Sequence, residues 1–497
     1  MFYAFFASFC FLSPRSGSAV PTHKESVVNF SSLEFIFLFF PVFFIIYYLL
    51  PSRFRNAAVF IGSVIFYAVG TYKHPAFLII LAALTVANYA LGLLIDFFPR
   101  RGRIWVSIGV VINIGSLFLF KYAESLFGGL GNLLSAILPF SVSFNTSGLI
   151  LPMGLSFYAF RAVSYLADVC RGDCPAERSP LDFAVFMCMF PCLVAGPITE
   201  YPEMREQLHT RSYTLDGFAD GARIFIAGLG LKAILANNLS AMWSRVAGLG
   251  YDSISSPLAW LSVIAYSLYI YFDFFGYSLM AMGTGKMMGF DIPENFREPY
   301  LSLSMSDFWR RWHITLNRWF KKYIYIPLGG SRCGAWRTVF NLLVVWLFTG
   351  MWHGASLNFI IWGLVLFLII TAEKFIYGKQ LEAHPVVGHI YMAAAIPLSW
   401  TVFAVTDLQK LGIFFCRLFP FLPQGEVFAV QGDWLAYAAQ YGVYILLGIV
   451  CCTSLPRLIK NRLNKTLVGD IILLGVLCVS VFFLCRSAGD PFMYGNF

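Results

Sequence analysis

Charged side chains are scarce in this sequence. Of its 497 residues only 12% are Asp, Glu, Lys or Arg, whereas 59% are hydrophobic, and the mean hydropathy is +0.71. A soluble globular domain usually has about 25% charged and about 45–50% apolar residues. The deficit of charge therefore excludes an ordinary soluble domain, and the composition is typical of a protein that lies in a lipid bilayer.

Several common catalytic motifs are also missing. The sequence has no G-x-x-x-x-G-K-[ST] loop, so we do not expect ATP hydrolysis. Neither G-x-S-x-G nor H-E-x-x-H occurs. The sequence therefore has neither the nucleophile motif of a serine hydrolase nor this common zinc-binding motif. The 11 cysteines lie mostly in apolar segments, and we interpret them as small buried hydrophobes. We therefore expect no bound metal, no bound cofactor and no disulfide framework.

Long apolar runs make up most of the chain instead. The strongest cover residues 33–50, 76–98, 104–120, 260–282, 356–371 and 469–484. A membrane-spanning helix needs ~20 mostly apolar residues. With the weaker runs between them, we predict an all-α polytopic membrane protein of about eleven to thirteen transmembrane helices. Residues 28–497 form its one domain, and residues 1–27 are a leader, either signal-like or the result of a mis-chosen start codon.

The positions of Lys and Arg predict the orientation in the membrane, because these residues collect in cytoplasmic loops. They follow the runs over residues 33–50 and 76–98 and precede the last run, at Arg53, Arg55, Arg100, Arg101, Arg103, Arg457, Lys460, Arg462 and Lys465. We predict that these loops are cytoplasmic and that both termini are outside. The net charge of +9 reflects this bias, so it does not indicate nucleic-acid binding.

One segment, residues 306–330, reads "SDFWRRWHITLNRWFKKYIYIPLGG" and is unusually polar. On a helical wheel at ~100° per residue its aromatic residues share one face and its cations the other. His313 and Asn317 lie four residues apart at the boundary. We predict one interfacial helix over residues 308–323, with the aromatics in the headgroup layer and the cations toward lipid phosphate. Anchoring alone does not require His313 or Asn317.

A second polar island, "FTGMWHGASLNF" at residues 348–359, interrupts an apolar run. A histidine at membrane depth is costly unless it is buried in protein or lines a wet cavity. His353 is therefore either a core histidine satisfied by a neighbour or a neutral general base. In the second case Gly350 and Gly354 would let a substrate approach the backbone. We predict that both polar islands face one shared cavity, because burying two histidines separately costs more.

The two islands resemble the membrane-bound O-acyltransferase family. "FWRRWHITLNRWFKKYIYIPLGGSR" and "FTGMWHGASLNFIIWG" are similar to its bacterial branch, which contains the membrane subunit of alginate O-acetyltransferase and the teichoic-acid D-alanyl transfer protein. "LPMGLSFYAFRAVSYLADVCRG", "FPCLVAGPI", "IPENFREPYLSLS" and the terminal "DPFMYGNF" agree as well. The chain departs from the family at Phe275 and Leu279, where Ser and Asp are usual.

The resemblance implies that His353, in the W-H-G motif, is catalytic, and that His313, in the R-R-W-H motif, is the second important position. It also implies transfer of an acyl group from a thioester, expected to be acetyl-CoA, through a central tunnel flanked by interfacial and re-entrant helices. We expect His353 to act as a base or a transient acyl carrier. His313 would orient the acyl group or stabilise the oxyanion, with Asn317 as a further donor. Trp352, Arg310 and Arg311 complete the predicted substrate site.

By the same resemblance the acceptor is an extracytoplasmic polysaccharide such as alginate. The expected setting is the inner membrane of a bacterium, with lipid and a separate extracytoplasmic acetyltransferase or acceptor protein as partners. Two alternatives stay open at this point. One is D-alanyl transfer to teichoic acid, and the other is a non-enzymatic transporter of a polymer or lipid-linked sugar.

Overall fold

The computed structural model describes residues 30–138, 140–146, 148–423 and 430–486. These residues form helices and loops without a strand, apart from one isolated antiparallel bridge between Phe296 and Trp312. The predicted all-α fold is confirmed. The predicted leader and the terminal "DPFMYGNF" motif lie outside the described residues.

Eight helices in the described part of the chain are long and apolar enough to cross a membrane. They are α4 (Ala76–Phe97), α5 (Gly102–Ile137), α10 (Leu215–Gly230) continuing through η4 (Leu231–Ala236) into α11 (Asn237–Leu249), α12 (Ser256–Met287), α16 (Leu357–Ala372) with η7 (Glu373–Tyr377) and α17 (Gly378–Ala383), α18 (Pro385–Ala404), α20 (Asp433–Cys451) and α22 (Leu467–Arg486). A shorter apolar helix, η1 (Phe35–Phe39) with α2 (Phe40–Leu49), precedes them. Eight is below the predicted eleven to thirteen, because other apolar segments form helices that are shorter or more polar than a full span.

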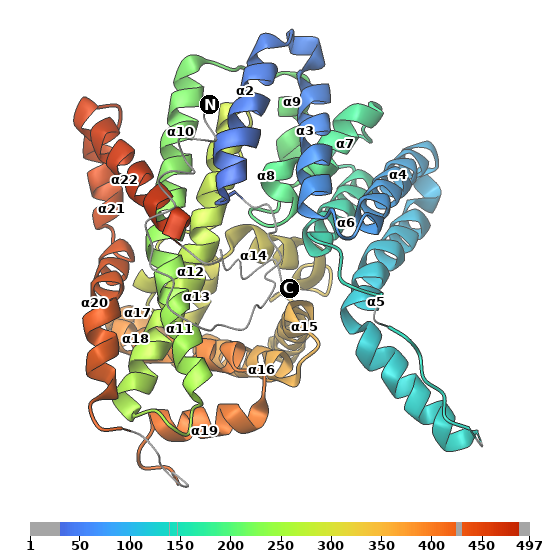
Figure 1. The fold of residues 1–497 in the computed structure, drawn as a ribbon. Helices are drawn as coiled ribbons and strands as arrows, with labels where there is room; N and C mark the ends of the chain where they lie inside the picture. Colours follow the sequence, from blue (N-terminus) through green and yellow to red (C-terminus); the bar gives the residue numbers. More distant parts are fainter. Residues whose placement is uncertain (1–29, 139, 147, 424–429, 487–497) are drawn as a thin grey trace.

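The remaining helices pack among these spans or at their ends. They are η2 (Ser52–Phe54), α3 (Arg55–Gly70), η3 (Pro99–Arg101), α6 (Leu155–Arg171), α7 (Pro180–Cys188), α8 (Phe190–Leu193), α9 (Tyr201–His209), η5 (Pro299–Leu301), α13 (Met305–Arg311), α14 (Ile314–Phe320), η6 (Lys321–Tyr325), α15 (Ala335–His353), α19 (Leu408–Leu418) and α21 (Leu455–Leu463). Helices α13 and α14, which carry the first polar island, lie in the middle of the molecule (Figure 1).

Helix α12 is the most buried of the eight candidate spans and runs beside α10 (Figure 1). Glycines bring the two backbones into direct contact. A Cβ atom added to Gly228 would lie 2.6 Å from the carbonyl oxygen of Gly276, and one added to Gly283 would lie 2.6 Å from that of Gly221. Small residues allow such close packing where lipid supplies no hydrophobic driving force between helices.

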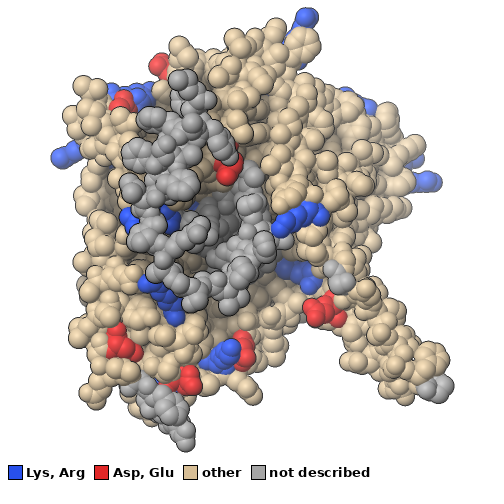
Figure 2. All heavy atoms as spheres, in the orientation of Figure 1, with Lys and Arg blue, Asp and Glu red and all other residues tan. Residues whose placement is uncertain are grey.

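Two of the three loops predicted to be cytoplasmic lie at the same end of the protein. The α2–α3 turn and the turn before α22 both lie at the upper end in Figure 1, whereas α19 and the free end of α5 lie at the lower end. Charged side chains are sparse on the face shown in Figure 2, and many large hydrophobic side chains are exposed, as expected for a surface that contacts lipid. That the upper end faces the cytoplasm stays a prediction.

Candidate active site

The first polar island is two helices rather than one, and the break lies at His313. This residue adopts φ +45° and ψ +55°, a left-handed conformation that is uncommon outside glycine. Backbone hydrogen bonds hold the chain on both sides of the break. Arg297 N donates to Arg311 O at 2.9 Å, and Ile314 N donates to Asn295 O at 2.9 Å. The prediction of a continuous helix is therefore wrong, because pairing with a neighbouring loop overrides local helix propensity.

The break also changes where the aromatic face points. Phe308, Trp312 and Trp319 are each no more than 3% exposed, and the Trp319 indole donates to Phe160 O at 2.9 Å. These side chains are buried in protein, so the prediction that they lie in the headgroup layer is wrong. Two short helices joined at an angle can both bury their aromatic residues, whereas one straight amphipathic helix at the surface could not.

The His313 ring is oriented by Asn295. Nδ1 of His313 lies 3.0 Å from Asn295 Oδ1, the oxygen that also accepts from the hydroxyl of Thr315 at 3.0 Å. The amide nitrogen of Asn295 donates to Ser278 Oγ at 3.2 Å, and the backbone N–H of Thr315, which can only donate, lies 3.4 Å from Oδ1, so this oxygen is the atom that faces His313. Because Oδ1 can only accept, Nδ1 of His313 carries the hydrogen and Nε2 carries the lone pair.

That lone pair is buried in the protein. Among the described residues, Nε2 of His313 has no hydrogen-bond partner. Burial lowers the pKa of His313 to about 3, so the imidazole is neutral throughout the physiological range. A neutral Nε2 of this tautomer accepts hydrogen bonds and cannot donate one. The arrangement therefore does not suit the predicted stabilisation of an oxyanion by His313, and it does suit acceptance of a hydrogen bond from a hydroxyl.

His353 is the last residue of α15 and lies in an aromatic cage. Its ring centroid is 5.1 Å from that of Trp362 and 5.0 Å from that of Phe403, both nearly perpendicular. The residue is only 5% exposed. Burial of an imidazole disfavours its charged form, so the environment suits a neutral base.

The glycines beside His353 serve packing. A Cβ atom added to Gly350 would lie 2.5 Å from the carbonyl oxygen of Phe359, and one added to Gly354 would lie 2.4 Å from the ring of the same residue. The glycines therefore admit Phe359 of α16. The prediction that they open the backbone to a substrate is wrong.

Trp352 lies between the two histidines. Its ring centroid is 6.5 Å from that of His313 and 4.5 Å from that of His353. Within the described residues its indole Nε1 has no hydrogen-bond partner, although the side chain is buried. The two polar islands converge as predicted, and that they face one shared cavity stays a prediction. The structure places an unused donor and an unused acceptor in the same buried region.

This combination of motifs and geometry agrees with comparisons to known proteins. The model of the membrane-bound O-acyltransferase family matches residues 1–406. The chain belongs to the membrane-bound O-acyltransferase family. It is 38% identical over 413 residues to a probable alginate O-acetylase of Azotobacter vinelandii, which covers 82% of this chain and 79% of the relative.

Two further relatives have different names. A peptidoglycan O-acetyltransferase of Helicobacter pylori is 32% identical over 434 residues, with 79% of this chain and 80% of the relative covered. A teichoic acid D-alanyltransferase of Bacillus subtilis is 28% identical over 241 residues, 45% of this chain and 59% of the relative. The protein is a multi-pass membrane O-acyltransferase.

Two residues of this O-acyltransferase that the sequence did not reveal hold the turn that carries His353. Tyr122 of α5 donates from its hydroxyl to Met351 O at 2.7 Å and to Gly354 O at 3.1 Å. Its neighbour Lys121 donates to the carbonyl oxygen of Trp352. Carbonyls at a helix C-terminus lack intrahelical partners, and a cation there is favourable. A lysine in a candidate membrane span was the sequence signal that marked this position.

Lys121 also borders a cavity of ≈ 530 Å³. The cavity lies between α5 and the following loop, and its lining combines polar and aromatic side chains: Phe120, Lys121, Ala123, Glu124, Phe144, Asn145, Thr146, Leu149 and Ile150. On its other side Lys121 lines a small gap that includes Trp352. Lys121 therefore adjoins both this cavity and the turn that carries the W-H-G motif.

Three side chains of α13 and α14 that were predicted to contact substrate instead bind other groups of these two helices. Asn317 donates to Trp309 O at 3.0 Å, so an oxyanion contact would require it to break this hydrogen bond. Arg310 and Arg311 form ion pairs with Asp307 of the same helix, at 3.3 and 2.9 Å. Such surface pairs are weak. The Arg310 side chain is 63% exposed, and its contact with the donor phosphates stays a prediction.

Two other cations of this segment are neutralised by carboxylates. Arg318 lies 2.9 Å from Glu200, and Lys322 lies 2.8 Å from the same carboxyl group and 2.9 Å from Asp168. This network ties α14 and η6 to α6 and to the start of α9. The prediction that the whole cationic face is directed at lipid phosphate is wrong for these two residues.

Proposed function

We propose that this O-acyltransferase transfers an acetyl group from acetyl-CoA to a hydroxyl of an extracytoplasmic polysaccharide. One observation carries the proposal: both histidine motifs converge at the Trp352 ring in the interior of a membrane domain. The names of its relatives favour acetyl over D-alanyl, since the acetyltransferase matches cover about four-fifths of the chain and the D-alanyltransferase match less than half.

The proposed reaction assigns a role to each group. The acceptor oxygen attacks the thioester carbonyl and the C–S bond breaks. His353 takes the hydroxyl proton and returns it to the departing coenzyme A thiolate. Trp352 Nε1–H donates to the carbonyl oxygen as negative charge develops there. Nε2 of His313 accepts a hydrogen bond from a second hydroxyl of the sugar and so positions the acceptor.

The donor and the acceptor would reach the site from opposite ends of the membrane domain. The donor would approach from the end with the α2–α3 turn, and Arg310, on α13 in the middle of the molecule, could attract its phosphates. The acceptor would approach through the cavity beside Lys121, because α5 runs from a predicted cytoplasmic loop toward the opposite end (Figure 1). The acyl group would cross between them through a tunnel, in the inner membrane of a bacterium. A separate extracytoplasmic acetyltransferase or acceptor protein could take the acyl group at the far end.

The test is acetyl transfer by purified protein in lipid nanodiscs. Labelled acetyl-CoA would be supplied with alginate or peptidoglycan as acceptor, and labelled polymer would be counted. Label that depends on His353, compared with a His389→Ala control at an exposed α18 position, would support the proposal. Transfer of D-alanyl from its thioester carrier, with no acetyl transfer, would contradict it and favour the teichoic-acid alternative.

A further inference from the structure

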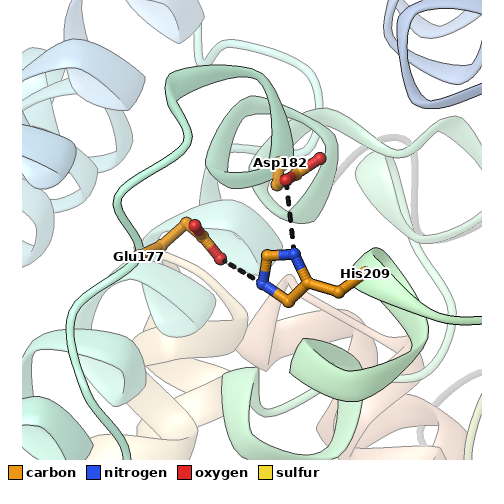
Figure 3. Close-up of side chains that lie close together, drawn as sticks. All are labelled: Glu177, Asp182 and His209. Atoms are coloured by element: carbon orange, nitrogen blue, oxygen red, sulfur yellow. Dashed lines mark hydrogen bonds and ion pairs between the residues drawn. The ribbon is translucent and has the colours of Figure 1, made fainter. Parts of the chain in front are cut away.

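Glu177, Asp182 and His209 meet at the end of the protein that carries α7 and α9. They come from the loop before α7, the first turn of α7 and the end of α9 (Figure 3). Each residue offers one ligand atom, and these atoms lie within 4.8 Å of one another. Nothing in the proposed acyl transfer uses them.

The two ring nitrogens of His209 both face carboxylates. Nε2 lies 3.1 Å from Glu177 Oε2, a normal hydrogen-bond distance, and Nδ1 lies 3.6 Å from Asp182 Oδ2 (Figure 3). A neutral imidazole has only one N–H. When Nε2 donates it to Glu177, the lone pair of Nδ1 points at the negative oxygen of Asp182. This contact is repulsive as long as Nδ1 carries neither a proton nor a metal ion that Asp182 also binds.

The surrounding groups leave the carboxylates short of positive charge. In the described part of the chain, the only ion pairs of Glu177 and Asp182 are those with His209. Glu177 is nearly buried, with a side chain 4% exposed, and accepts from the Tyr201 hydroxyl and from Ser179 N. Arg211 binds the oxygen of Asn56, whose amide nitrogen in turn donates to Asp182.

We propose that Asp182 and His209, backed by Glu177, bind a divalent transition-metal ion of the Zn²⁺ type. The Nδ1–Oδ2 distance of 3.6 Å is too long for a hydrogen bond. It is close to the ~3.4 Å that separates two ligand atoms around a tetrahedral zinc ion. A carboxylate on the second ring nitrogen, as Glu177 provides, is the usual way in which proteins orient a metal-binding histidine. Water would complete the coordination, since the His209 side chain is 42% exposed.

The ion would connect elements that hold the candidate active site. It would join α7 to the end of α9, and the start of α9 contacts α14 and η6 through the Glu200 ion pairs with Arg318 and Lys322. We therefore assign it a structural role, which is independent of acyl transfer.

The experiment uses the full chain, purified in detergent without a polyhistidine tag and treated with a chelator. Zn²⁺ is added, unbound ion is removed by desalting, and the bound metal is measured by mass spectrometry together with the melting temperature. We expect about one equivalent of zinc and a rise in Tm of at least about 2 °C. Co²⁺ in place of zinc should give d–d absorption bands, which report ligation directly.

Conservative variants separate ligation from folding. Asp182→Asn can still accept from Asn56, and His209→Gln can still donate to Glu177, so both should fold and lose the bound metal and the Co²⁺ bands. Glu177→Gln should weaken affinity by about 10–100-fold. His389→Ala removes an exposed histidine on α18 and should change nothing. The proposal is overturned if the unaltered protein retains no zinc, or if Asp182→Asn and His209→Gln retain as much as it does; the cluster is then held by a proton on His209 alone.

Discussion

Asn295 Oδ1 lies 3.0 Å from His313 Nδ1 and so decides which nitrogen of that imidazole faces the interior of the site. The same side chain accepts from Thr315 and donates to Ser278, so it cannot turn without losing other hydrogen bonds. A histidine oriented by a third group is the arrangement that many enzymes use for a proton or hydrogen-bond acceptor. The relationship leads to the first prediction.

Asn295→Leu should reduce acetyl transfer by about 10-fold or more, because the His313 ring loses the acceptor that fixes its tautomer. Asn295→Asp should restore part of the rate, since a carboxylate also accepts from Nδ1–H. The measurement is kcat for acetyl transfer per unit of folded protein. Equal losses in both variants would show that Asn295 acts only through packing.

The pH dependence should change with the charge at position 295. His313 has a pKa of about 3, so it is deprotonated at any higher pH and should impose no acid limb between pH 5 and 8. A carboxylate beside Nδ1 in Asn295→Asp stabilises the imidazolium and raises that pKa. The variant should therefore lose activity as the pH falls through the raised value. A pH profile of kcat/KM identical to that of the unaltered protein would contradict this prediction.

His353→Ala should leave at most about a per cent of the acetyl-transfer rate, since a general base typically contributes ~10²–10⁴-fold. His313→Ala should lose less if that residue only positions the acceptor. Both variants should still fold and insert in the membrane. Retention of more than about a tenth of the rate in His353→Ala would remove it from the catalytic role.

Lys121→Met should lower kcat with little effect on the affinity for acetyl-CoA, because Lys121 supports the carbonyl of Trp352 from the acceptor side. Tyr122→Phe removes the hydroxyl that binds Met351 O and Gly354 O and should cause a smaller loss of the same kind. Steady-state kinetics with each substrate varied in turn would measure both effects. Exposed Lys73→Met, on the loop between α3 and α4, is the control.

The segment from residue 297 to 337 should be reached only from the cytoplasm. Cys333 is exposed there, and the other exposed free cysteines of the described residues are Cys478 and Cys485 on α22. In a variant with those two and Cys10 replaced by Ser, an impermeant maleimide should label Cys333 in inverted vesicles but not in intact cells. Labelling in intact cells would reverse the predicted orientation.

Lys232→Met should destabilise the fold by about 3–5 kcal/mol, because it removes the ammonium group 2.5 Å from the buried carboxylate of Asp273. The double variant Lys232→Met/Asp273→Leu should recover much of this loss, since neither charge then stays buried. The measurement is the melting temperature in detergent, followed by tryptophan fluorescence. A single variant as stable as the unaltered protein would mean that this pair is not needed for stability.

Composition and local pattern were sufficient for much of this protein. Scarce charge and repeated apolar runs predicted an all-helical membrane domain, because a bilayer requires every backbone polar group to be satisfied within the segment. The cost of burying two histidines in such a chain was enough to predict that His313 and His353 face one region. These inferences depend only on residue types and on their spacing along the chain, both of which can be read from the sequence.

Contacts between distant residues decided the rest. The left-handed turn at His313 exists because residues 295–297 pair with the chain around it, so a helical wheel could not reveal it. Gly354 makes room for Phe359, Lys121 reaches the end of a helix more than two hundred residues away, and Glu177, Asp182 and His209 meet without any recognisable spacing. Each of these depends on how helices pack, and packing is set by the summed fit of many side chains rather than by any local motif.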